Sequence, residues 1–163
     1  MVEIYREVLP DEAATEQFAA DIALLVKPGD LLALSGDLGA GKTTFARAFV
    51  RAFCHASDIE VPSPTFTLVQ TYSAPDGTVV FHSDLYRLKG PDEIEDLGLE
   101  DERESAVLLV EWPDRMPADW WQDALKIEFE HHTDDPDSGR YIVVTSENLN
   151  WQRRLMNQFG SQV

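Results

Sequence analysis

The fold class follows from one run of residues, Leu31-Leu32-Ala33-Leu34-Ser35-Gly36-Asp37-Leu38-Gly39-Ala40-Gly41-Lys42-Thr43. It begins with a short apolar run over 31–35, which predicts a strand covered on both faces. Residues 36–43 match the pattern G-x-x-x-x-G-K-[ST], in which a glycine-rich turn leads into a helix. Residues 42–53 carry a phenylalanine at every fourth position, which is typical of the buried stripe of an amphipathic helix. A strand, a glycine turn and a helix in this order favour an α/β fold.

The glycine-rich turn has the chemistry of a phosphate site. Glycines let successive backbone N–H groups point at one anion, and the following helix adds the positive end of its dipole. We expect Lys42 to reach the outer phosphates, Thr43 to ligate Mg²⁺ and Thr44 to hydrogen-bond the inner phosphate. The residues expected to contact phosphate are Gly36, Gly39, Ala40, Gly41, Lys42, Thr43 and Thr44. The alternative is a turn with a purely structural role.

Two acidic residues follow apolar runs elsewhere in the chain. Asp84 comes directly after residues 79–83, and Glu111 comes directly after residues 107–110. Ligands of open α/β sheets collect at the carboxyl ends of strands, so both carboxylates are expected to face the glycine turn. One would hold Mg²⁺ while the other orients or deprotonates an attacking water. The alternative for each is a capping or solvated carboxylate.

Three other side chains have both a structural and a functional interpretation. Thr65 follows Pro62-Ser63-Pro64 and could contact the metal or the last phosphate, or simply belong to a loop. Trp112 follows Glu111 and is either core or part of a lid or contact surface. His82 is expected to support the site from behind its surface rather than to ligate a metal.

Composition limits the partners of the chain. It has 163 residues, which suits a single domain spanning 1–163, and 13 Lys and Arg against 30 Asp and Glu give a net charge of −17. This balance argues against direct binding of DNA or RNA backbone and against docking on anionic lipid, but it permits a basic protein partner. Cys54 is the only cysteine and is expected to be a buried structural thiol. With no signal peptide and no apolar run long enough to span a bilayer, we expect a cytoplasmic protein with no membrane contact.

The remaining pattern predicts alternating strands and helices. Strands are expected at 2–8, 66–73, 78–83, 106–110, 125–130 and 141–145, and helices at 11–26, 92–99 (a helix or a turn) and 149–159. Asp11 is the expected N-cap of the first helix, and Arg153 and Arg154 are expected to be exposed on the last. Together these elements predict a P-loop NTPase-type three-layer sandwich, with a largely parallel central sheet and added antiparallel strands.

Four motifs in order resemble the bacterial TsaE (YjeE) family: Gly36–Thr44, Ser63–Val69, His82–Leu88 and Leu109–Pro113. The acidic segment 92–99 between the last two fits as well, and the resemblance spans roughly 9–140. Members of this family are small P-loop ATPases. With TsaB and TsaD they make the threonylcarbamoyl modification on a tRNA adenosine beside the anticodon.

The resemblance implies ATP/ADP and Mg²⁺ as ligands. It implies nucleotide contacts from 39–44, metal ligation by Thr43 and Glu111, and a role in hydrolysis for Asp84. Thr65 and Trp112 would lie in two switch-like regions. Gly139-Arg140 would flank the adenine, together with a residue near Asp11, Glu12 or Thr15. Hydrolysis would be weak alone, would be activated by TsaB and TsaD, and would reset their complex, with tRNA reached only through these partners.

Two other functions share the glycine turn. A small-molecule kinase is one, but the arginine-rich lid typical of such kinases is not found between Thr65 and Pro117. A nucleotide-gated binding module without significant turnover is the other. The set Lys42, Thr43, Asp84 and Glu111 argues against a catalytically dead site.

Overall fold

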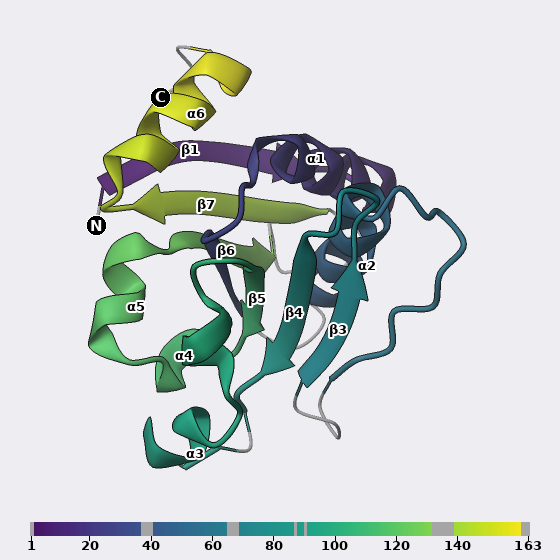
Figure 1. Cartoon of the computed structure of the whole chain (residues 1–163). Helices are drawn as coiled ribbons and strands as arrows, with labels where there is room; N and C mark the ends of the chain where they lie inside the picture. The colour runs from purple at the N-terminus through teal and green to yellow at the C-terminus, as the bar shows by residue number, and fades with distance from the viewer. Residues whose placement is uncertain are drawn as a thin grey trace.

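The structure, a computed structural model, describes residues 2–36, 41–64, 69–86, 88–89, 91–131 and 139–160. Its strands form one seven-stranded sheet in the order β1-β7-β6-β2-β5-β4-β3 (Figure 1). The elements in chain order are β1 (Val2–Leu9), α1 (Glu12–Leu25), β2 (Leu31–Gly36), α2 (Lys42–Phe53), β3 (Val69–Ser73), β4 (Val79–Asp84), α3 (Pro91–Glu95), α4 (Leu99–Glu102), β5 (Val107–Glu111), the 3₁₀ turn η1 (Pro113–Arg115), α5 (Ala118–Asp123), β6 (Leu125–His131), β7 (Arg140–Ser146) and α6 (Leu149–Phe159).

The sheet is mixed. The four neighbouring strands β6, β2, β5 and β4 pair in parallel. Both ends of the sheet are antiparallel, because β3 forms a hairpin with β4 and β7 forms one with β6, while β1 adds to β7. The expectation of a parallel central sheet with added antiparallel strands is therefore confirmed. Hairpin connections reverse the chain and so add antiparallel neighbours.

Helices cover both faces of the sheet. One core cluster joins α1, α2 and α6 to residues such as Leu32, Leu34 and Leu109 of the central strands. A second cluster joins α3, α4 and α5 to the alternate residues, among them Leu31, Ala33 and Leu108. Side chains of a strand alternate between its faces, so strands covered on both sides are apolar throughout. This explains the continuous apolar runs of β2 and β5.

Most predicted elements are confirmed within a residue or two, including the hairpins and the N-cap of α1, where Asp11 accepts a hydrogen bond from the Ala14 amide at 2.8 Å. The acidic segment forms two short helices, α3 and α4. Helix α5 is absent from the predictions, since six residues are too few for a helical period to be recognised. Residues 66–68 of the expected strand lie outside the described residues.

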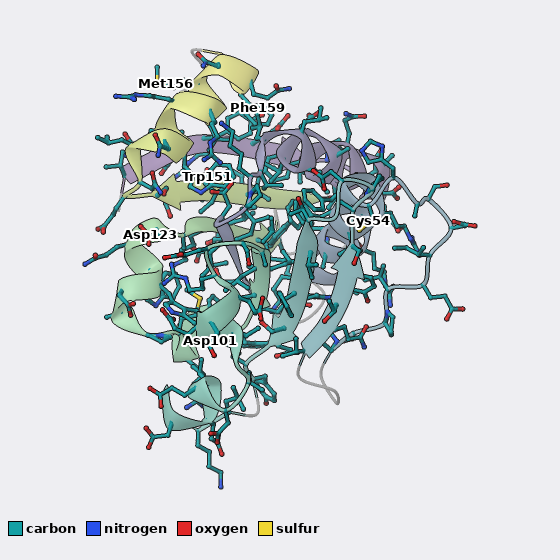
Figure 2. The ribbon with its side chains drawn as sticks, in the orientation of Figure 1. Cys54, Asp101, Asp123, Trp151, Met156 and Phe159 are labelled. Atoms are coloured by element: carbon teal, nitrogen blue, oxygen red, sulfur yellow. The ribbon has the colours of Figure 1, made fainter. Side chains whose placement is uncertain are left out.

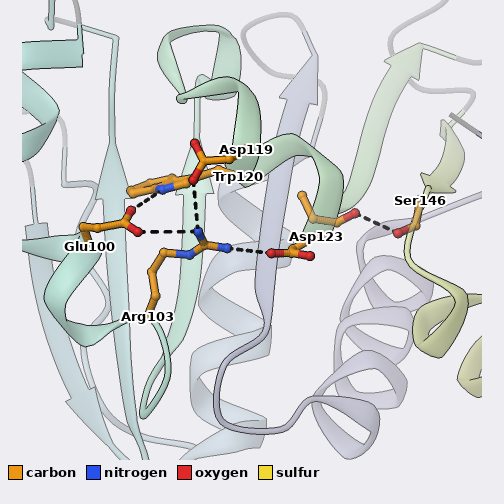
Figure 3. Close-up of polar contacts among 7 residues, drawn as sticks. Glu100, Arg103, Asp119, Trp120, Asp123 and Ser146 are labelled. Atoms are coloured by element: carbon orange, nitrogen blue, oxygen red, sulfur yellow. Dashed lines mark hydrogen bonds and ion pairs between the residues drawn. The ribbon is translucent and has the colours of Figure 1, made fainter.

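Arg103 joins the short helices on one face of the sheet (Figure 3). Its guanidinium lies 3.1 Å from a carboxylate oxygen of Asp123 and 3.8–3.9 Å from oxygens of Glu100 and Asp119. The indole of Trp120 is completely buried and donates to Glu100. One cation therefore links three carboxylates on α4 and α5 in the most acidic part of the chain.

The prediction that Arg154 is exposed is wrong, while Arg153 is exposed as expected. Helix α6 packs with Trp151 buried and Met156 pointing to solvent (Figure 2). Three residues after Trp151, Arg154 lies at the edge of this interface. Its guanidinium contacts Asp30 at 2.6 Å and the Leu25 carbonyl at 3.3 Å. Arg154, which the sequence pattern predicts to be solvated, instead ties α6 to the α1–β2 connection.

We predict that Arg154→Ala lowers the free energy of unfolding by about 1–3 kcal/mol, because it leaves the mostly buried Asp30 carboxylate without its cation. Urea unfolding followed by circular dichroism measures the change. Arg153→Ala is the matched control and should stay within about 0.5 kcal/mol of wild type. Equal effects of the two substitutions would contradict a docking role for Arg154.

Candidate functional site

Two glycines border the turn between β2 and α2. Gly36 has φ +135° and Gly41 has φ +111°, a region that L side chains rarely adopt. A Cβ at Gly36 would lie 2.3 Å from the Phe129 carbonyl oxygen of the neighbouring strand β6. Only glycine lets β2 pass this close to β6 before the chain turns into α2. The expected contacts Gly39 and Ala40 lie outside the described residues, as does Thr65.

Lys42 begins α2 and is only 5% exposed. Its ammonium donates to the Gly36 carbonyl at 2.6 Å, which closes the turn across its two ends. The same nitrogen lies 3.9 Å from the centre of the Trp112 ring, a cation–π contact. Thr43, in the first turn of α2, is exposed, and Thr44 is half-buried. Lys42 and Gly36, two of the residues expected to contact phosphate, are thus brought together.

The two predicted acids lie side by side. Asp84 ends β4, Glu111 ends β5, and the two residues are register partners in the parallel pairing. They are 4% and 6% exposed. Glu111 also pairs in register with Leu34, whose side chain lies in the core cluster that contains α2. Both carboxylates are therefore gathered at the carboxyl end of the sheet, on the face covered by α2.

Each carboxylate has a hydrogen-bond partner in the structure. Asp84 accepts a hydrogen bond from the Tyr86 amide at 2.9 Å. Glu111 Oε2 lies 2.6 Å from Nε2 of His82, which is itself buried. The expectation that His82 supports the site rather than ligating a metal fits this geometry. The described residues contain no cluster of three or more His, Cys, Asp or Glu side chains able to hold a metal ion by themselves.

Trp112 is not a core residue. It is half-buried, with its backbone at φ 55° and ψ 59°, a left-handed conformation that is uncommon for a bulky side chain. The Lys42 ammonium lies over its ring, and the ring of the exposed Tyr86 lies 4.9 Å from it. Strained backbone of this kind is concentrated at functional sites. Of the two interpretations, the structure favours a cover or contact surface.

A cavity of about 570 Å³ runs along α2 from Thr44 to Arg51, and it is also lined by Glu12 and Glu16 of α1 and by residues of the loop at 57–62. Arg140, from β7, also approaches this end of the sheet, since a Cβ added at Gly41 would lie 3.5 Å from its Cγ. Of the residues that the resemblance assigns to adenine contact, Arg140 thus lies beside Gly41, and Glu12 lines this cavity.

Two arginines of α2 that the sequence pattern does not single out hold the loop before Thr65. Arg47 and Arg51 of α2 donate from Nε to the carbonyls of Val61 and Ile59, each at 3.0 Å. Their spacing of four residues on one helix was the available signal, but the partners are backbone carbonyls that no side-chain pattern reveals.

Cys54 is buried at the end of α2, and burial raises the pKa of its thiol (Figure 2). A thiol that ionises less readily is a poorer nucleophile at neutral pH, so the prediction of a buried structural thiol is confirmed. No helix among the described residues is both long enough and apolar enough to cross a membrane.

Fold and site together define an α/β protein with a mixed sheet, whose polar side chains gather where the central parallel strands end. A sequence model of the family described as "Threonylcarbamoyl adenosine biosynthesis protein TsaE" matches residues 9–142. The chain belongs to the TsaE family, which takes part in tRNA threonylcarbamoyladenosine biosynthesis.

Individual relatives agree. The TsaE protein of Rickettsia bellii is 45% identical over 105 residues, covering 64% of this chain and 72% of that protein. The TsaE protein of Bacillus subtilis is 40% identical over 133 residues, covering 80% of this chain and 79% of that protein. A crystal structure of YdiB from Bacillus subtilis superposes with a TM-score of 0.71 at 30% identity, covering 97% of this chain and 93% of that one.

We predict that Gly36→Ala lowers the free energy of unfolding by about 2–4 kcal/mol, because the added methyl meets the Phe129 carbonyl in addition to the strain of a positive φ. Gly98→Ala isolates the strain, since Gly98 has φ +73° and nothing within 4 Å of an added Cβ. This control, Gly98→Ala, should lower the free energy of unfolding by about 1–2 kcal/mol. Urea unfolding compares the two, and a Gly36 variant no worse than the Gly98 variant would contradict the close approach of β2 to β6.

Proposed function

We propose that this chain is a magnesium-dependent P-loop ATPase that acts in the cytoplasm on the TsaB–TsaD complex during tRNA threonylcarbamoyladenosine formation. The proposal includes a P-loop NTPase-type fold, binding of ATP and ADP, weak hydrolysis by the chain alone and activation by the two partners. The observation that carries it is the buried Lys42 at the glycine turn, on the sheet face to which Asp84 and Glu111 also belong.

The residues present suit a magnesium–nucleotide complex. Glu111 offers a buried carboxylate, and Thr43 offers a hydroxyl at the start of α2. Hard oxygen ligands of this kind are the ones that Mg²⁺ prefers, and it usually completes its shell with water and substrate phosphates. When bound, the ion would neutralise charge that develops on the phosphates.

The chain's own side chains then have separate tasks. Lys42 would place its positive charge beside the outer phosphates, where it stabilises the transition state more than the ground state. Asp84 would orient the attacking water or accept its proton. Trp112 contacts both Lys42 and the exposed Tyr86, so it would couple events at the phosphates to a surface that a partner can touch.

The acidic balance of the chain supports an indirect role in tRNA modification. At a net charge of −17 the surface repels nucleic acid backbone, whereas a partner complex with basic surface would be attracted. We therefore place tRNA on the partners and nucleotide turnover on this chain. A nucleotide-driven change at Trp112 would reset the partners between cycles.

We predict low ATP consumption by the purified chain, a clear rise on adding TsaB and TsaD, and loss of both in Lys42→Ala. Phosphate release measures the rate, and Lys27→Ala, a lysine exposed far from the glycine turn, is the matched control. Consumption that required a small-molecule acceptor would instead support a kinase. Tight nucleotide binding without turnover under any condition would support a binding module.

Substitutions of the two carboxylates are expected to have different effects on nucleotide binding and turnover. Asp84→Asn should keep magnesium-dependent nucleotide binding and reduce turnover by about 10²–10⁴-fold, as loss of a general base does. Glu111→Gln should weaken nucleotide binding only when magnesium is present. Calorimetric titration with a non-hydrolysable ATP analogue, alongside phosphate release, distinguishes the two roles. The reverse pattern would exchange the assignments.

A further inference from the structure

The contact between His82 and Glu111 is a buried polar interaction within the proposed metal site. Nε2 of His82 lies 2.6 Å from Oε2 of Glu111, and the two side chains are 2% and 7% exposed. An ionised carboxylate only accepts hydrogen bonds, so the proton of this contact belongs to Nε2. His82 therefore donates to Glu111 from inside the protein.

The register of the strands explains the direction of this contact. On β4 and β5, His82 pairs with Leu109, and Asp84 pairs with Glu111. His82 thus lies one diagonal step behind Glu111 on the same face of the sheet, within reach of a long side chain. From the interior side, His82 hydrogen-bonds one of the two carboxylate oxygens of Glu111. This hydrogen bond uses Oε2 of Glu111, so a ligand at the strand end would bind through the other carboxylate oxygen, Oε1.

The other nitrogen of His82 shows that packing alone does not account for this residue. Nδ1 is buried and has no hydrogen-bond partner among the described residues. A buried polar atom without a partner destabilises the fold, and an apolar ring of similar size would fill the same space without that cost. The polar contact that His82 does make in the described structure is the one to Glu111.

We propose that His82 is a positioning residue that fixes the Glu111 carboxylate in the orientation needed to bind Mg²⁺ with the nucleotide. Without this hydrogen bond, the glutamate side chain would have to be ordered by the metal itself, which weakens metal binding. The inference rests on the proposed function, because it assigns His82 a task only if Glu111 is a metal ligand.

The test compares nucleotide affinity with and without magnesium. A non-hydrolysable ATP analogue is titrated calorimetrically into the full chain, once with excess Mg²⁺ and once with EDTA, and the ratio of the two Kd values is taken. His82→Phe keeps a ring but removes the donor, and it should reduce the magnesium-dependent gain in affinity by about tenfold or more. The EDTA affinity should stay near wild type.

Three matched variants separate positioning from packing. His82→Gln retains an Nε2 donor at similar reach and should restore most of the ratio, whereas the shorter His82→Asn should not. Ser83→Ala changes a fully buried neighbour on β4 whose hydroxyl has no hydrogen-bond partner in the described structure, and it should leave the ratio unchanged. If His82→Phe fails to fold, the comparison of Gln with Asn decides the question.

The outcomes distinguish this proposal from the proposed function. A wild-type ratio in His82→Phe or His82→Asn overturns the positioning role while leaving the ATPase intact. Equal losses with Mg²⁺ and with EDTA indicate a packing role and overturn it as well. If the nucleotide affinity of the wild-type chain does not depend on magnesium, the metal site of the proposed function is refuted, and this inference with it.

Discussion

The position of β2 between β5 and β6 is the constraint on which the site depends. Parallel pairing on both sides brings the ends of these strands to one edge of the sheet, and register sets Glu111 beside Leu34 and Asp84 beside Glu111. The chain then has to leave β2 where the Phe129 carbonyl allows no side chain, which requires glycine at position 36. The site is thus a consequence of how the central strands align.

The charged residues differ between the two faces of the sheet. Residues 91–123 hold 12 Asp and Glu against two arginines, and the helices of this segment cover the face of the sheet opposite α1 and α2. On the α2 face, Lys42 is buried beneath Trp112, and Glu111 is held by His82. Local contacts of this kind set the chemistry of a site more than net charge does, because nearby charges in a buried region are poorly screened.

Much of the secondary structure could be predicted from local patterns. The apolar runs of β2 and β5, the phenylalanine stripe of α2 and the N-cap Asp11 each depend on neighbours a few residues away. Lys42, Asp84 and Glu111 could also be selected as candidates, from the glycine-turn pattern and from their positions after apolar runs. Helix α5 and the burial of Arg154 could not, since a six-residue helix has no visible period and Asp30 lies far from Arg154 in the sequence.

Residue type and short-range spacing are enough to predict the α/β class, the glycine turn and the identity of the acids. Three sets of contacts are visible in the folded chain alone: Trp112 lies over Lys42, His82 donates to Glu111, and Arg47 and Arg51 hold the loop carbonyls. Such contacts depend on strand register and on the placement of backbone carbonyls. No local sequence pattern encodes strand register or carbonyl placement, because both are set by the packing of elements that are distant in the chain.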